Sequence, residues 1–123
     1  MKIAVTAQNP GWTELLMTRF GRAACFVVVD GETKEWQAVE NQQNRQATQG
    51  AGIQAARTII EQGAEVLISG NVGPKAFRVL QAGAVRMFRT DPASQKTVAD
   101  AVADWEQGKL EEIQAATVEG HSI

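Results

Sequence analysis

The chain contains few of the side chains that metal sites and nucleophilic sites commonly use. Its 123 residues include one cysteine, Cys25, one histidine, His121, and no tyrosine. One cysteine cannot form a disulfide within the chain, and a lone cysteine is typical of the reducing cytoplasm, where we expect this protein to reside. A closed zinc site needs about four ligands, which Cys25 and His121 cannot supply.

Long apolar runs and a strong net charge are also absent. The apolar stretches are as short as strands, so we expect neither a membrane span nor, at the MKIAVTA start, a signal peptide. Residues 1–99 carry 11 basic and 8 acidic side chains, whereas residues 100–123 carry one basic and six acidic ones. This weakly basic body argues against a nucleic-acid partner and leaves room for a local cationic site.

The hydrophobic content of 44% and charged content of 21% are those of a globular protein. Apolar patterning and turn residues predict strands at 2–7, 24–30, 35–40, 66–68 and 85–88. The same signals predict helices from about 50 to Gly63, from Pro74 to Gly83, and from Asp91 or Ser94 to Gly108. Leu15, Leu16 and Met17 suggest a short helical turn inside the loop 8–23.

This element order predicts an α/β fold, with a mixed five-stranded sheet flanked by about three helices. We expect residues 1–107 to form one α/β domain. The acidic extension at 108–123 is expected to be part of that domain or to pack on it.

Several polar loops should meet at one edge of this sheet. Strand directions place the loops at 8–23, 41–49, 69–73 and 89–91 at the carboxyl ends of strands, where open α/β sheets bind ligands. Two of these loops are rich in glycine and lead into helices, whose amino ends favour anions. The loops also carry cations and neutral donors, namely Arg19, Arg22, Arg45, Lys75, Arg89, Gln8, Asn9, Asn41, Asn44 and Asn71. Glu14, Glu40 and Asp91 reduce the positive potential of this predicted anion site.

A simpler interpretation is available for each motif alone. A glycine-rich turn is most often only a strand–helix connection. GNVGPKA at 70–76 lacks the spacing of a nucleotide-binding P-loop and the Ser or Thr that would bind Mg²⁺. Cys25 starts an apolar strand and is expected to be buried, whereas Met17 lies in a loop where its thioether can face a ligand.

Together, the motifs resemble a known family over residues 1–107. They are MKIAV at 1–5, RFGRA at 19–23, GAG at 50–52, ISGNVGPKAF at 68–77 and LQAG at 80–83. The sequence is similar to the dinitrogenase iron–molybdenum cofactor biosynthesis proteins. This resemblance implies a ribonuclease-H-like fold and the binding or carriage of a metal–sulfur cluster.

Within that family, the chain is similar to members that hold a mixed molybdenum–copper sulfide cluster non-covalently. Many other members have histidine where this chain has Arg19, and histidine near the loop that here offers Gln46 and Gln49. These differences make an iron–molybdenum cofactor precursor the alternative cargo. The expected binding residues are Gln8, Asn9, Arg19, Phe20, Gly21, Arg22, Gly50, Ala51, Gly52, Gly70, Asn71, Val72, Gly73 and Lys75, with no direct protein–metal bond.

We expect no enzymatic activity. The first strand lacks the carboxylates that a two-metal nuclease needs, and Cys25 has no base near it in sequence. The acidic segment after Asp100 supports a different hypothesis, a protein-interaction or regulatory module without a cluster. The helix amino ends leave a third one open, a binder of small phosphate ligands.

Overall fold

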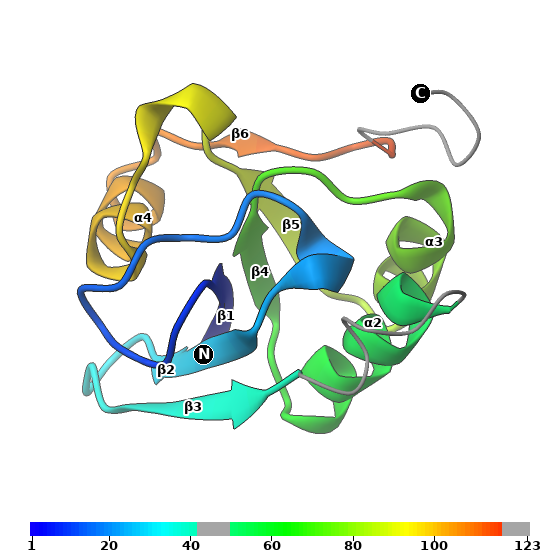
Figure 1. Cartoon of the computed structure of the whole chain (residues 1–123), viewed down its shortest axis with the longest axis horizontal. Coiled ribbons are helices and arrows are strands. Elements are labelled where there is room, and N and C mark those ends of the chain that lie inside the picture. Colours follow the sequence, from blue (N-terminus) through cyan, green and yellow to red (C-terminus); the bar gives the residue numbers. More distant parts are fainter. Residues whose placement is uncertain (42–49, 117–123) are drawn as a thin grey trace.

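A computed structural model describes residues 1–41 and 50–116 of the chain. A six-stranded sheet forms its centre, in the order β3-β2-β1-β4-β5-β6 (Figure 1). The elements are β1 (Lys2–Ala7), η1 (Phe20–Arg22), β2 (Cys25–Asp30), β3 (Trp36–Glu40), α2 (Ala51–Glu61), β4 (Val66–Ser69), α3 (Pro74–Ala82), β5 (Arg86–Arg89), η2 (Pro92–Ser94), α4 (Val98–Glu106) and β6 (Glu111–Glu112).

The strand directions confirm the predicted mixed sheet. β1 is antiparallel to β2 and parallel to β4, which is in turn parallel to β5. β3 is antiparallel to β2 and therefore runs in the same direction as β1. The carboxyl ends of β1, β3, β4 and β5 consequently lie at one edge of the sheet, which we call the carboxyl edge. The narrower ribonuclease-H-like assignment stays a prediction.

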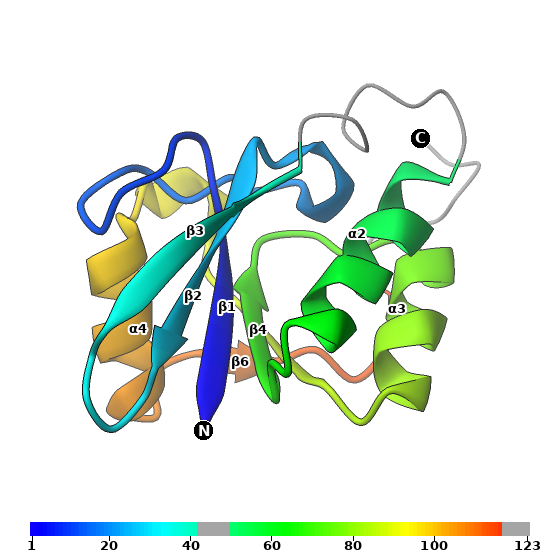
Figure 2. The same cartoon turned by 90° about the horizontal axis from the view of Figure 1, so that it is seen from below.

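Helices cover both faces of the sheet (Figure 2). α2 and α3 pack on one face, over a core that includes Phe26, Leu67 and Leu80. α4 packs on the other face, over a core that includes Val27, Ile68 and Val102. Because both faces are covered, β4 is buried along its whole length and β1 is exposed only at Lys2. Among the described residues, no helix has the length and apolar character needed to cross a membrane.

The sheet has six strands, so the predicted count of five was wrong. The additional strand β6 contains only two residues, both of them glutamates, and it pairs antiparallel with β5. Glu112 forms an ion pair with Arg86 at 2.9 Å. The following Ile113 is 5% exposed and donates its N–H to the carbonyl oxygen of Met87 at 2.7 Å. Two acidic residues carry no strand periodicity, so only tertiary contacts define this strand.

Two local predictions also differ from the structure. The third helix begins at Val98, because Thr97 and Asp100 form a capping box there and Gln95 adopts a left-handed conformation with φ 51°. Only the short 3-10 turn η2 forms earlier, at Pro92–Ser94. Leu15 and Leu16 form isolated β-bridges to Thr97 and Ala7 in place of the expected helical turn.

We predict that Thr97→Ala destabilises the protein by about 1 kcal/mol, because the substitution removes the hydroxyl that accepts the Asp100 N–H. Thr97→Ser keeps that acceptor and is the matched control. Urea denaturation followed by circular dichroism measures both. Equal stability of the alanine and serine variants would contradict this assignment of the α4 start.

Candidate functional site

The helices α2 and α3 begin next to each other at the carboxyl edge. Each follows a strand that ends there, β3 for α2 and β4 for α3. The two helices pack against each other near their first turns, where a Cβ built on Gly52 would lie 3.2 Å from the Cβ of Ala76. Two helix amino ends, each with a partial positive charge and with N–H groups that have no partner inside the helix, therefore lie side by side (Figure 2).

The 3-10 turn η1 lies against the start of α2. A Cβ built on Gly21 would lie 3.1 Å from the backbone nitrogen of Gly52 and 3.2 Å from its Cα atom. Contacts this short leave almost no room for a side chain at position 21. The adjacent Arg22, which is half-buried, is thereby carried to the amino end of α2.

The loop before η1 runs alongside the end of β4. Arg19 and Asn71 form a parallel bridge, in which Phe20 donates its N–H to the Asn71 carbonyl oxygen at 3.1 Å. Asn71 donates its own N–H to the Thr18 carbonyl oxygen at 2.6 Å. A Cβ on Gly70 would lie 2.5 Å from that oxygen. Residues 18–20 and 70–71 therefore form one interlocked backbone unit.

Two buried hydroxyl groups, of Thr6 on β1 and Ser69 on β4, connect this unit to the sheet. Thr6 donates its hydroxyl to the Met17 carbonyl oxygen at 2.6 Å and forms a second hydrogen bond with the Ser69 hydroxyl at 3.0 Å. Both residues are 0% exposed. The sequence analysis missed them, although a hydroxyl residue near the end of each of two apolar strands was a visible signal.

The amino ends of α2 and α3 lack the side-chain caps that α4 has. The residues that precede the two helices are Gly50, with φ 76°, and Gly73, and neither helix has a side-chain cap hydrogen bond. A Cβ on either glycine would meet nothing within 4 Å. The space beside both helix starts is thus open among the described residues.

Most of the predicted binding residues lie in this unit, at different depths. Arg19 and Lys75 are exposed, and Gly21, Arg22, Gly50, Gly52, Asn71 and Gly73 are half-buried. Phe20, Ala51, Gly70 and Val72 are buried, and the ring of Phe20 stacks on Phe26 at 5.8 Å between ring centres. The exposed and half-buried residues form the surface of the edge, and the buried ones support it through packing.

Gln8 and Asn9 lie in a different part of the loop. Gln8 donates its backbone N–H to the Leu15 carbonyl oxygen at 3.0 Å, and the side-chain amide of Gln8 contacts the Leu16 carbonyl at 3.4 Å. Leu16 in turn donates its N–H to the Lys96 carbonyl oxygen at 2.9 Å. This part of the loop therefore leads toward α4, away from the starts of α2 and α3.

The remaining predicted donors are dispersed. Arg89 lines a separate pocket of about 420 Å³ together with Asp91, Lys96 and Lys109. Asn41 is buried and donates its side-chain amide to the Ala23 carbonyl oxygen at 2.9 Å. Other predicted positions lie outside the described residues, namely Asn44, Arg45, Gln46, Gln49 and His121.

The two sulfur groups considered as metal contacts, in Cys25 and Met17, differ in burial. Cys25 is 1% exposed, and burial, followed by the charges of Glu40 and Glu14, raises the pKa of its thiol. The thiolate form that binds metals is therefore disfavoured. Met17 is half-buried against the α2–α3 core. Among the described residues, no group of three or more His, Cys, Asp or Glu side chains is arranged to hold a metal ion.

Comparison with known proteins identifies the family. A family model described as dinitrogenase iron-molybdenum cofactor matches residues 1–108. The chain belongs to the dinitrogenase iron-molybdenum cofactor family. In this family, the solved apo form of the orange protein from Desulfovibrio gigas is 39% identical to this chain, with a TM-score of 0.88. The match covers 95% of this chain and 96% of that one.

Other relatives are more distant. The NMR structure of a candidate NifB protein from Thermotoga is 30% identical, with a TM-score of 0.83, over 97% of this chain and 98% of that one. An uncharacterized protein of Methanocaldococcus jannaschii is 29% identical over 117 residues, which cover 93% of this chain and 92% of the relative. The family resemblance seen in the motifs is thus confirmed over nearly the whole chain.

We predict that Gly70→Ala destabilises the protein by about 1–3 kcal/mol, because its Cβ would lie 2.5 Å from the Thr18 carbonyl oxygen and would force the loop away from β4. Gly73→Ala is the matched control, since its Cβ would enter open space at φ −73°. Thermal unfolding monitored by circular dichroism measures both variants. An equal change in Tm for the two would show that the loop is not held at Gly70.

Proposed function

We propose that this protein binds and carries an anionic metal–sulfur cluster at the carboxyl edge, and that it acts as a carrier or store and not as an enzyme. The observation that carries the proposal is the contact between the amino ends of α2 and α3, which have no side-chain cap and lie beside open space among the residues that the structure describes. Family membership and the likeness to the orange protein support the same conclusion.

The donors at this edge suit a cargo that brings its own sulfide. Backbone N–H groups at the first turns of α2 and α3 can donate to sulfide or oxide atoms at the surface of the cluster. Pro74 has no N–H, so the donors of α3 begin at Lys75. The exposed side chains of Arg19 and Lys75 add positive charge to the same part of the carboxyl edge. Such a site recognises charge and shape and requires no protein–metal bond.

We propose a molybdenum–copper sulfide cluster as the cargo, with an iron–molybdenum cofactor precursor as the alternative. A thiomolybdate–copper anion carries sulfide ligands for both metals, so the protein does not need to supply a thiolate. Cys25 is buried and the pKa of its thiol is raised, which agrees with a cluster that supplies all of its own sulfur ligands.

Reconstitution tests the proposal directly. The protein is incubated anaerobically with tetrathiomolybdate and Cu⁺ and is then desalted at low ionic strength. We expect a coloured protein that contains molybdenum, copper and sulfide. Retention should decrease as salt increases, because ions screen exposed charges. A colourless protein, with all metal in the wash, would contradict the proposal.

Charge-removing variants locate the site. Arg19→Gln and Lys75→Gln should each raise the Kd for the cluster about two- to fivefold at low salt, since one exposed charge contributes up to about 1 kcal/mol. Lys109→Gln removes a cation that lines the pocket near α4, and it is the matched control with unchanged binding. If Lys109→Gln weakens retention as much as Lys75→Gln, general charge and not the carboxyl edge holds the cluster.

A further inference from the structure

Within residues 1–41 and 50–116, no strand pairs with the outer side of β3. This strand is the outermost one of the sheet on the side opposite β6 (Figure 1). Asp30 donates its N–H to the Glu35 carbonyl oxygen at 2.9 Å, and Asn41 donates its N–H to the Ala24 carbonyl oxygen at 2.9 Å. Along an antiparallel strand, the backbone N–H and C=O groups of successive residues point alternately toward the neighbouring strand and away from it. These two bonds therefore show which residues direct their backbone groups toward β2. The backbone groups that point toward β2 are those of Glu35, Gln37, Val39 and Asn41.

The intervening residues Trp36, Ala38 and Glu40 therefore direct their N–H and C=O groups outward. All three are exposed, and their side chains lie on one face of the strand because they alternate. Trp36 is 43% exposed, which is unusual for so large an apolar side chain, and it stands at the start of this row. An unpaired strand edge beside an exposed aromatic ring is a template for an added strand.

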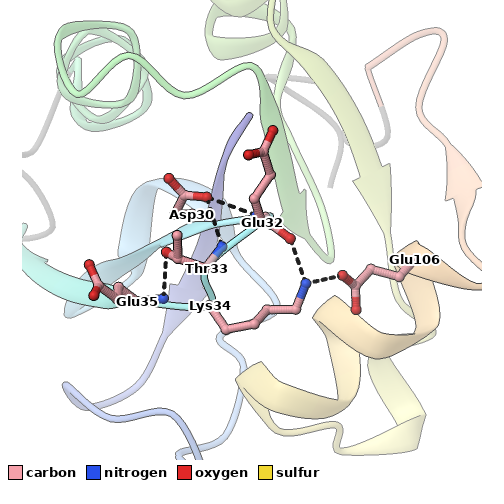
Figure 3. A network of polar contacts seen from close by, with 7 residues as sticks. Asp30, Glu32, Thr33, Lys34, Glu35 and Glu106 are labelled. Carbon is pink, nitrogen blue, oxygen red and sulfur yellow. Dashed lines mark hydrogen bonds and ion pairs between the residues drawn. The ribbon is translucent and has the colours of Figure 1, made fainter.

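The hairpin that carries β3 is held in place before any partner arrives (Figure 3). The Asp30 carboxylate accepts the N–H groups of Glu32 at 2.8 Å and Thr33 at 3.2 Å, and these bonds lower the pKa of Asp30. The Lys34 ammonium donates to the Gly31 carbonyl oxygen at 2.6 Å and pairs with Glu106 on α4. A rigid turn reduces the entropy that a partner must remove on binding.

Charge selects the kind of partner. The only cation of residues 31–40, Lys34, is already paired with Glu106. Among the described residues, Glu32, Glu35 and Glu40 form no ion pair. Figure 3 shows the carboxylates of Glu32 and Glu35 directed away from Lys34. Outside this segment, Lys2 lines a pocket together with Asp30, Glu35 and Trp36. The acidic side chains of Glu32, Glu35 and Glu40 still outnumber this cation, so the outer side of β3 combines an excess of negative charge with an indole ring. A lysine or arginine side chain is attracted to both.

We propose that β3 is a docking edge for an extended, basic segment of a partner protein. The segment adds a strand beside Trp36, Ala38 and Glu40, and its basic side chains contact the Trp36 ring and Glu40. Glu40, at the end of β3, lies on the carboxyl edge, but the proposed cluster site at the first turns of α2 and α3 uses none of Trp36, Ala38 and Glu40.

The probe is a short peptide of alternating lysine and valine, and the peptide with glutamate in place of lysine is its control. Titration of the isotope-labelled protein is followed by NMR. We expect the basic peptide to bind and to slow hydrogen exchange at the amides of Trp36, Ala38 and Glu40. The amide of Gln37 already faces β2 and should change little. Equal binding of the acidic peptide would overturn the proposal.

One substitution removes an outward donor without removing a bond to β2. Ala38→Pro should weaken peptide binding about tenfold, because proline lacks the N–H that the added strand needs. Ala38→Val keeps the N–H and is the matched control. Trp36→Leu should weaken binding about two- to fivefold and serves as the second variant if Ala38→Pro does not fold.

Unchanged binding by the Trp36→Leu variant, or by folded Ala38→Pro, would overturn the proposal. Protection of the same amides that appears on raising the protein concentration alone would also overturn it, because a second copy of the chain would then occupy the edge.

Discussion

Close backbone packing at glycine residues is the constraint on which the carboxyl edge depends. Gly70 lets the loop pass directly over the end of β4, and Gly21 lets η1 lie against the first turn of α2. Gly52 then lets α2 approach α3 at Ala76. At each contact the glycine has no side chain that would separate the two segments, so the loop and both helix starts form one interlocked unit. A Cβ at position 70 would collide with the Thr18 carbonyl oxygen at 2.5 Å, and a Cβ at position 21 would lie only 3.1 Å from the Gly52 nitrogen.

This packing determines the electrostatics of the edge. α4 satisfies its own amino end with the Thr97–Asp100 capping box, whereas α2 and α3 begin at glycines and have no side-chain cap. Two amino ends in contact, neither with a side-chain cap, concentrate partial positive charge and N–H donors at one place on the carboxyl edge. As far as residues 1–41 and 50–116 are concerned, the space at Gly50 and Gly73 is open, which leaves these donors accessible to a bulky anion.

Local signals predicted most of the elements, whereas tertiary pairing decided the rest. Pro74 marked the start of α3 correctly, and the Asp30-Gly31 turn marked the β2–β3 hairpin. β6 was missed because two glutamates gain strand geometry only from β5. Strand directions alone predicted that Arg22, Gly50 and Lys75 would lie at one edge. The separation of Gln8 from them depends on the bridge from Leu15 to Thr97 and on the hydrogen bond from the Leu16 N–H to Lys96, which no local pattern encodes.

The central claim is that the first turns of α2 and α3 hold the anion, and NMR tests it most directly. Isotope-labelled protein is titrated with the tetrathiomolybdate–copper anion, and the amide shifts are mapped onto the structure. The account predicts the largest shifts at the amides of Ala51, Gly52, Lys75 and Ala76, with the Asp100 amide in the capped α4 unchanged. Shifts centred instead on Arg89 and Lys109, in the pocket near α4, would contradict it.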